Sequence, residues 1–205
     1  MAGKIDFYYN PQSRAAVTRW ALEEAGADYE IKQVRFGEGE GIDSRSDEFL
    51  AINPMGKIPT LVLDDGTVLT ENGAIIAWLA DAYPDAGLAP PPGSPERGTM
   101  YRWLFFMGSC FEPAMTDRMM RPDSTINPRS LGWGDYDHVV DTLEKALAQG
   151  PWLLGDNFSA ADIYVAASLG WAGMFGAPRI KESQVIQDYV ARASARPAAQ
   201  RANGA

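Results

Sequence analysis

Two short motifs in the first half of the sequence carry groups that could hold a charged, peptide-like ligand. The first is Lys57-Ile58-Pro59-Thr60, in which a proline stands at a predicted strand. X-Pro bonds adopt the cis form at low cost, and a cis bond here would turn the N–H and C=O of Ile58 outward. An extended peptide could then pair with that backbone as an added strand. The alternative is an ordinary proline at a sheet edge.

The second motif is a polar pair, Glu71-Asn72, at the start of a predicted helix. A helix N-terminus offers free N–H groups and the positive end of the helix dipole, and both suit a carboxylate. A carboxylate side chain beside them can accept hydrogen bonds from an amino group. The pair could therefore hold the α-amino-acid end of a peptide, or it could be only a helix cap.

The elements that would position these motifs alternate between strand and helix up to about residue 83. Strands are predicted at 4–8, 29–34, 58–63 and 67–69, with a helix after the first and after the last. We expect Asn10 to cap the first helix, Pro11 to lie in its first turn and Gly26 to end it. Asp64-Asp65-Gly66 predicts a hairpin turn. We assign the middle helix to the loose segment between the second and third strands, and the resulting order βαβ-α-ββα is the thioredoxin arrangement.

A proline-rich stretch, residues 84–94, then predicts a linker between two domains, 1–83 and 95–205. The second domain contains no convincing strand, and helices are predicted at about 95–120, 135–148, 159–173 and 181–194. Ser94 followed by Pro95 predicts the start of the first of these helices. Ser159-Ala-Ala-Asp162 is a variant of the capping box. We therefore expect a fold of the class α/β plus all-α, in which the first domain is α/β and the second is an all-α helical bundle.

Composition excludes several classes of function. The net charge of −9 disfavours nucleic acids and anionic membranes as partners. No run of 18 apolar residues is present, and the first residues lack the apolar segment of a signal peptide, so a cytoplasmic protein is expected. With Cys110 as the one cysteine and His138 as the one histidine, we expect no disulfide, no dithiol and no metal site.

The motifs together resemble the soluble, bacterial-like glutathione transferases. The resemblance extends over nearly the whole chain and rests on five segments in the family's order: 53–61, 69–75, 103–114, 158–163 and 194–198. It implies a glutathione-binding thioredoxin-like domain, a helical domain and an electrophile pocket between them. It further implies a homodimer with a role in detoxification, with glutathione and a hydrophobic electrophile as its ligands.

The resemblance also assigns roles to the two motifs. Ile58, between Lys57 and Pro59, would pair through its backbone with the cysteinyl part of glutathione, and Glu71 and Asn72 would hold the γ-glutamyl end. Many members of the family have Ser where this chain has Asn72, but an amide offers both a donor and an acceptor. Basic or amide side chains in the segment between the second strand and this motif are candidates for binding the glycyl carboxylate: Lys32, Gln33, Arg35 and Arg45.

The residue that activates the thiol stays open at this point. A hydrogen bond to the thiolate would lower the pKa of the glutathione thiol, which lies near about 8.5 when free. In an alignment with tyrosine-type transferases Tyr8 would be the donor, with Arg14 adding positive charge. In an alignment with serine-type members the position falls on Asn10. Ser13 is the remaining hydroxyl, and no cysteine stands here for mixed-disulfide chemistry.

Apolar side chains on the first long helix of the second domain are candidates for the electrophile pocket: Tyr101, Phe105, Cys110 and Met115. Such side chains suit varied hydrophobic electrophiles, although apolar helix residues also commonly form a core. The main interpretation is conjugation of glutathione to such compounds. The alternatives are a glutathione-dependent peroxidase, isomerase or dehalogenase at the same site, and a ligand-binding module without catalysis.

Overall fold

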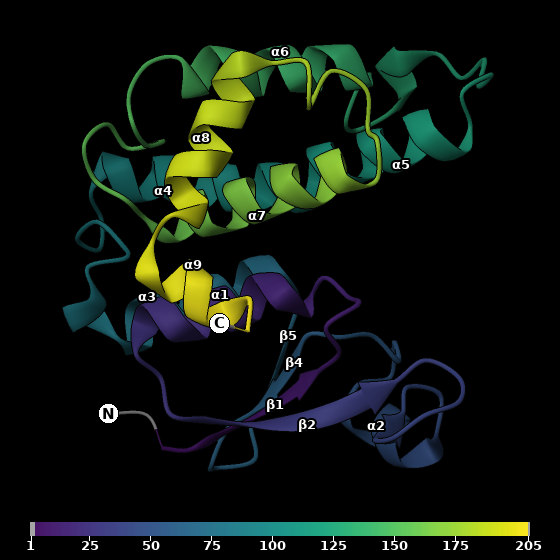
Figure 1. The fold of residues 1–205 in the computed structure, drawn as a ribbon, viewed down its shortest axis with the longest axis vertical. Coiled ribbons are helices and arrows are strands. Elements are labelled where there is room, and N and C mark those ends of the chain that lie inside the picture. The colour runs from purple at the N-terminus through teal and green to yellow at the C-terminus, as the bar shows by residue number, and fades with distance from the viewer. Residues whose placement is uncertain (1–2, 205) are drawn as a thin grey trace. The chain divides into compact units, whose positions relative to one another are not determined.

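The computed structural model describes residues 3–204, which fall into two compact units (Figure 1). The sheet unit comprises the chain up to Leu88 together with the chain from Pro197 onward, and the helical unit is Ala89–Arg196. The division therefore differs from the expected one at its end. The expected second domain ran to residue 205, whereas the last helix, α9 (Pro197–Ala202), packs on α1 (Ala15–Ala25) of the sheet unit.

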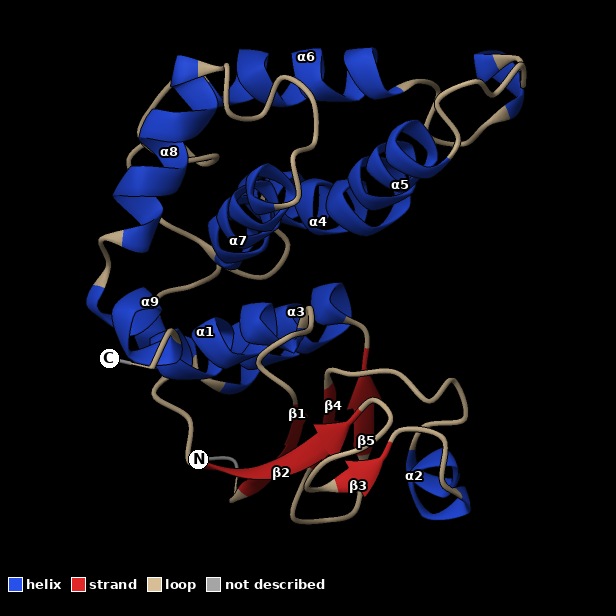
Figure 2. Cartoon of the chain, turned by 45° about the vertical axis from the view of Figure 1, so that its right-hand side comes forward, coloured by secondary structure: helices blue, strands red, loops and turns tan. Residues whose placement is uncertain are grey.

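The sheet unit is built on five strands in the order β3-β2-β1-β4-β5. The strands are β1 (Ile5–Tyr9), β2 (Tyr29–Arg35), β3 (Ile42–Asp43), β4 (Thr60–Val62) and β5 (Val68–Thr70). β1, β2 and β3 pair in parallel, and β4 is antiparallel to both β1 and β5. In Figure 2, α1 and α3 (Asn72–Ala82) lie over one face of the sheet and α2 (Asp47–Ile52) lies beside the other. This arrangement confirms the thioredoxin-like prediction.

Alternation along β1 assigns its side chains to the two faces of the sheet. Ile5, Phe7 and Tyr9 are buried, whereas the side chains between them are partly exposed. The Tyr8 ring lies 5.5 Å from the ring of Phe49 on α2, measured between centroids. Because successive strand residues point to opposite faces, the buried set belongs to the face that α1 and α3 cover.

The start of α1 differs from the prediction. The helix begins at Ala15 with Arg14 as its N-cap, so Asn10 does not cap it and Pro11 precedes its first turn. The Asn10 side chain instead donates to Val34 O (2.7 Å) and accepts from Gln12 N (2.9 Å). This amide links the end of β1 to β2, and the helix begins about one turn later in the sequence than predicted. Gly26 ends α1 at φ +65°, as expected.

The helical unit contains α4 (Pro95–Phe106), α5 (Glu112–Met120), α6 (Tyr136–Leu147), α7 (Ala160–Met174) and α8 (Gln184–Ser194). A π-helical segment, Met107–Phe111, joins α4 to α5, so the long helix expected at 95–120 has an irregular middle. The Ser94 side chain accepts from Arg97 N at the start of α4, as predicted. Short 3₁₀ turns lie at Pro84–Ala86 and Pro128–Ser130.

Buried polar groups link the helices of this unit. The Asp162 carboxylate accepts from Ser159 N and Oγ (both 2.8 Å), from Leu153 N (2.9 Å) and from the Tyr189 hydroxyl (2.8 Å). The capping box is thus confirmed, and its carboxylate also anchors α8 and the loop before α7. Burial nevertheless raises the pKa of Asp162, against the effect of these hydrogen bonds.

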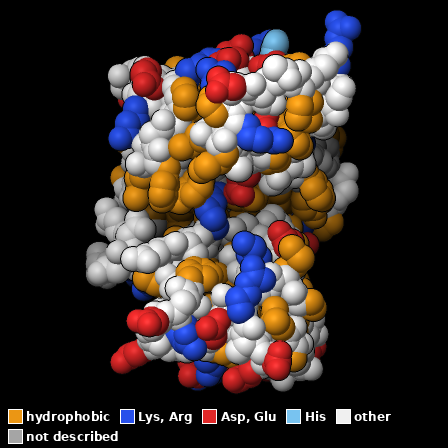
Figure 3. Space-filling model, turned by 90° about the vertical axis from the view of Figure 1, so that its right-hand side faces the viewer, with side chains coloured by type: hydrophobic (Ala, Val, Ile, Leu, Met, Phe, Trp, Pro, Cys, Tyr) orange, Lys and Arg blue, Asp and Glu red, His pale blue; other side chains and the backbone are white. Residues whose placement is uncertain are grey.

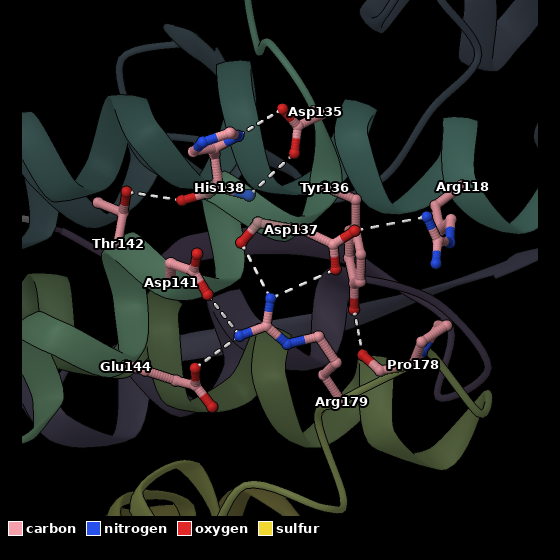
Figure 4. Close-up of polar contacts among 10 residues, drawn as sticks. All are labelled: Arg118, Asp135, Tyr136, Asp137, His138, Asp141, Thr142, Glu144, Pro178 and Arg179. Atoms are coloured by element: carbon pink, nitrogen blue, oxygen red, sulfur yellow. Dashed lines mark hydrogen bonds and ion pairs between the residues drawn. The ribbon is translucent and has the colours of Figure 1, made fainter.

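A second polar cluster fixes the loop after α7 to the surface of α6 (Figure 4). The Arg179 guanidinium donates to Asp141 Oδ1 (2.6 Å) and to Glu144 Oε2 (2.7 Å), and it also contacts Asp137. The Tyr136 hydroxyl donates to Pro178 O (2.7 Å). His138 lies on the same helix and contacts Asp135, as Figure 4 shows.

Candidate active site

The ends of three strands bring the predicted glutathione-binding residues together at one edge of the sheet. Tyr8 pairs with Thr60 across β1 and β4, and Thr60 pairs with Thr70 across β4 and β5. Because both pairings are antiparallel, the residues just before Thr60 lie opposite the residues just after Tyr8 and Thr70. Ile58 and Pro59 are therefore flanked by the end of β1 on one side and by Glu71 on the other.

The backbone of Ile58 is unpaired within the described residues, and the residue as a whole is 9% exposed. The Ile58–Pro59 peptide bond is cis, which is the first of the two alternatives that the sequence offers. Within residues 3–204, neither the N–H nor the C=O of Ile58 takes part in a hydrogen bond. The preceding carbonyl, Lys57 O, is occupied, since it accepts from Asn53 Nδ2 (2.7 Å) and from Thr60 Oγ1 (3.0 Å). An extended peptide could thus find a fixed donor and acceptor at Ile58.

Glu71 presents an exposed carboxylate from a strained backbone. Its φ is +68° and its ψ +119°, a conformation that residues with a Cβ rarely adopt. The carboxylate makes no hydrogen bond or ion pair with the described residues. Strain of this kind persists where the surrounding structure imposes it, and it is concentrated at functional sites.

The side chain of Asn72, which was expected to hold the γ-glutamyl end, is bonded within the protein. The residue is 8% exposed, and its amide points into the protein. Its Oδ1 accepts from Thr18 Oγ1 (2.8 Å), and its Nδ2 donates to Arg14 O (3.3 Å). The Asn72 amide thus joins the starts of α1 and α3. The groups of Asn72 and Gly73 that remain available for a ligand are the first backbone N–H groups of α3.

Thr18 is a partner of Asn72 that the sequence analysis missed. It lies in the first turn of α1 and is fully buried, so its hydroxyl needs a partner inside the protein. A polar residue among the apolar positions Val17, Ala21 and Leu22 was the available signal. Nothing local indicated that its partner would lie 54 residues away, at the start of α3.

The three candidates for activating the thiol differ in how their donors are used. The Ser13 hydroxyl donates to Asn10 O (2.7 Å) and accepts from Ala15 N (3.1 Å). The Asn10 amide is shared between Val34 O and Gln12 N. The Tyr8 hydroxyl makes no hydrogen bond within residues 3–204. Burial, followed by the negative charge of Asp6, raises the pKa of Tyr8, so the phenol stays protonated at neutral pH.

The basic candidates for binding the glycyl carboxylate differ in whether they already form ion pairs. Lys32 is paired with Glu30 (2.8 Å) and Asp6 (3.4 Å), and Arg35 is paired with Asp43 (2.9 Å). Arg45 makes no ion pair with any described residue, and its guanidinium lies beside Gly56. Gly56 has φ +61°, and a Cβ there would lie 3.2 Å from Arg45 Nη1.

The four residues expected in the electrophile pocket belong to the helical unit and differ in exposure. Phe105 is 73% exposed, Tyr101 and Cys110 are half-buried, and Met115 is only 3% exposed. Met115 therefore faces the interior of its own unit and is part of its core. The Tyr101 hydroxyl accepts from Arg97 Nε (3.0 Å), and Cys110 lies in the π-helical segment.

The remaining expectations concern the histidine, a metal site and membrane spans. His138 is exposed on α6, as a surface helix residue would be. Residues 3–204 contain no cluster of His, Cys, Asp and Glu suited to a metal ion. In the same range, every helix is too short or too polar to cross a bilayer.

Comparison with known proteins identifies the family of the chain. Sequence models of the glutathione S-transferase N-terminal and C-terminal domains match residues 13–82 and 74–192. Glutathione S-transferase GstA of Escherichia coli O157:H7 is 30% identical over 168 residues, 82% of each chain.

Two solved structures extend the match to nearly the whole chain. A glutathione transferase from Methylococcus capsulatus is 36% identical, with a TM-score of 0.80 and 97% coverage of both chains. A sphingomonad glutathione S-transferase complexed with glutathione is 32% identical, with a TM-score of 0.79 and coverage of 97% of this chain and 96% of that one. The chain belongs to the glutathione S-transferase family.

Proposed function

We propose that this protein conjugates the thiolate of glutathione to small hydrophobic electrophiles. The observation that carries the proposal is the unpaired backbone of Ile58 directly beside the exposed carboxylate of Glu71. The cysteinyl residue of glutathione pairs with the Ile58 N–H and C=O. Glu71 accepts from the γ-glutamyl ammonium, and the first N–H groups of α3 receive the α-carboxylate.

The third charged group of glutathione, the glycyl carboxylate, is assigned to Arg45. Lys32 and Arg35 already neutralise neighbouring carboxylates, so recruiting either would break an existing ion pair. Arg45 lies beside Gly56, two residues before Ile58, and is free of ion pairs within residues 3–204. Lys57 is exposed next to Ile58 and adds positive charge at the same edge.

The chemistry requires a thiolate and a poised electrophile. The Tyr8 hydroxyl donates to the glutathione sulfur, and the charge of Arg14 at the start of α1 favours the thiolate further. The sulfur lone pair forms the new C–S bond, while the bonding pair of the broken bond leaves with the departing group. Tyr101, Phe105 and Cys110 contact the electrophile, since they carry apolar surface that is at least partly exposed.

The protein acts in the cytoplasm as a homodimer and serves in detoxification. Large hydrophobic side chains are exposed on both units, and such side chains support closure about a two-fold axis. Figure 3 shows hydrophobic side chains among charged ones on one face of the molecule. The most exposed are Phe36, Met55, Phe105, Met120, Met174 and Phe175. Light scattering tests the proposed homodimer by measuring the mass of the particle in solution. A mass of 22.3 kDa, that of one chain, would contradict it.

Titration calorimetry with glutathione tests the binding mode. Glu71→Ala should weaken binding by roughly 2–4 kcal/mol, the scale for losing one partner of a charged pair. Glu96→Ala is the matched control, because Glu96 is an exposed carboxylate in the first turn of α4. Equal affinities for the wild type and a folded Glu71→Ala protein would remove Glu71 from the site.

Turnover assays separate conjugation from its alternatives. A panel of aryl halides, hydroperoxides and haloalkanes, each with glutathione, distinguishes a conjugating enzyme from a peroxidase or a dehalogenase. Thiol–disulfide exchange would have to use glutathione sulfurs alone, since Cys110 is the one cysteine and lies in the helical unit. Tight glutathione binding without any turnover would favour the ligand-binding module.

A further inference from the structure

We infer that Thr18 is a positioning residue for glutathione, which acts through Asn72 to fix Glu71 and the first N–H groups of α3. The inference rests on the proposed glutathione site. Thr18 itself is fully buried and reaches no ligand. Its effect depends on the hydrogen bonds that connect α1 to the start of α3.

The hydroxyl of Thr18 departs from the usual behaviour of a helical threonine. In a helix this hydroxyl commonly returns to the carbonyl four residues earlier, which here is Arg14 O. That carbonyl instead accepts from Asn72 Nδ2 (3.3 Å), and Thr18 Oγ1 donates to Asn72 Oδ1 (2.8 Å). One turn of α1 thus supplies both a donor and an acceptor to a single amide.

These two contacts determine the orientation of the Asn72 side chain. A flipped amide would turn its oxygen toward the carbonyl oxygen of Arg14, where two acceptors would face each other without a hydrogen bond. The Arg14 carbonyl therefore selects the orientation of the amide, and in that orientation Thr18 supplies the donor for Asn72 Oδ1. Removing the Thr18 hydroxyl would leave this buried oxygen without a partner, which is costly.

The fixed side chain constrains the residue before it. Glu71 adopts φ +68° and ψ +119° immediately before Asn72. A strained conformation of this kind persists only where neighbouring contacts over-determine the backbone. Without the Thr18 donor, the start of α3 gains freedom to relax, and the carboxylate and N–H groups lose their shared geometry for the γ-glutamyl end.

Thr18→Val tests the inference, because it keeps the branched shape and removes only the hydroxyl. We expect the Kd for glutathione by calorimetry to rise about tenfold, which corresponds to about 1.4 kcal/mol. The KM for glutathione should rise likewise, whereas kcat at saturating glutathione and the KM for an aryl chloride should stay nearly unchanged. Thr18→Ser retains the hydroxyl and should restore the wild-type Kd. If Thr18→Val does not fold, Thr18→Ala compared with Thr18→Ser gives the same contrast.

Tyr136→Phe is the control for a loss that is only structural. It removes a hydroxyl that donates to Pro178 O in the helical unit, so it should lower the melting temperature without raising the Kd for glutathione. A double-mutant cycle completes the test, because a residue that acts through Asn72 has no further effect once Asn72 is truncated. In an Asn72→Ala background, Thr18→Val should therefore leave the Kd unchanged.

Three outcomes overturn the inference. An unchanged Kd in a folded Thr18→Val protein would show that the hydroxyl does not position the site. Additive losses in the double mutant would show that Thr18 acts by another route than Asn72. A wild-type protein that binds no glutathione would overturn the proposed function as well, and calorimetry on the wild type alone identifies that case.

Discussion

At the scale of single residues, the open choice is which donor stabilises the glutathione thiolate. Ser13 uses its single donor, and Asn10 uses one of its two N–H groups, within the loop that leads into α1. Recruiting Ser13 would cost a hydrogen bond that the protein now makes. Tyr8 would gain a partner instead, and its raised pKa keeps the proton on the phenol oxygen.

Tyr8→Phe should therefore raise the pKa of the bound glutathione thiol while changing glutathione affinity little. The substitution keeps the packing of the ring against Phe49 and removes only the donor. In the wild type we expect that pKa to lie about one to three units below the free value, each unit being about 1.4 kcal/mol. The thiolate absorbance of the complex, titrated against pH, provides the measurement.

Ser13→Ala is the matched control and should leave the bound thiol pKa nearly unchanged. The reverse result, with Ser13→Ala raising the pKa and Tyr8→Phe having no effect, would assign a serine-type mechanism. If neither substitution changes the pKa, Asn10 or the N–H groups at the start of α1 carry the thiolate.

His138, in the helical unit, gives a pH-dependent prediction. Its Nδ1 lies 2.5 Å from Asp135 Oδ2, and this carboxylate raises the pKa of the imidazole. As the one histidine in the sequence, it gives a single, unambiguous imidazole signal in a proton NMR titration. We expect a pKa above the ordinary value of about 6.5, and Asp135→Asn should lower it toward that value.

The sign of the linked stability follows from the same shift. The raised pKa means that the folded protein binds this proton more tightly than the unfolded chain does. The stabilisation is fully present below the unfolded pKa and is lost as the pH rises through the folded pKa. Asn at position 135 can still cap α6, so a pKa that stays high in Asp135→Asn would assign the shift to Asp141 and Asp137.

At the scale of elements, the strained backbone at the start of α3 lowers the stability of the protein at the proposed glutathione site. A residue with a Cβ at φ +68° costs about 1–2 kcal/mol relative to relaxed backbone. Glu71→Gly should relieve part of that strain and raise the free energy of unfolding by about 1 kcal/mol, while glutathione binding is lost. Chemical denaturation together with calorimetry measures both effects on one protein.

Glu71→Ala separates the two contributions, because alanine removes the carboxylate and keeps the Cβ. It should lose glutathione affinity without becoming more stable than the wild type. A Glu71→Gly protein no more stable than Glu71→Ala would show that the backbone at this position carries no relievable strain.

The elements also show where sequence reasoning succeeds. Strand alternation, the Gly26 terminus, the Ser94 cap and the Ser159–Asp162 box depend on near neighbours, and the structure has each of them. The predicted start of α1 was wrong because the Asn10 side chain donates to Val34 O, which lies 24 residues away. The link between Thr18 and Asn72 was missed for the same reason, since its partners are set by tertiary packing.

At the scale of the whole molecule, the chain leaves the sheet unit after Leu88 and returns to it at Pro197. Local sequence patterns do not predict this return, because α9 is short and its buried residues Ala198, Ala199 and Ala202 are small. Their small size lets α9 pack closely on α1, where Arg201 Nε also donates to Glu23 Oε2 (2.8 Å). The sheet unit is therefore completed by the segment that begins at Pro197.

Deleting residues 197–205 should consequently destabilise the sheet unit selectively. Hydrogen exchange followed by mass spectrometry should show faster exchange across α1, and α7 in the helical unit should keep its protection. Glutathione affinity should fall as well, because α1 carries Arg14 and Thr18, which contact Asn72.

Arg201→Ala is the control: its ion pair with Glu23 is largely exposed, with 55% of the Arg201 side chain accessible, and such pairs contribute about 1 kcal/mol or less. Exchange that rises equally in α1 and α7 would mean that the two units unfold as one, and unchanged exchange in α1 would mean that α9 contributes nothing to its stability.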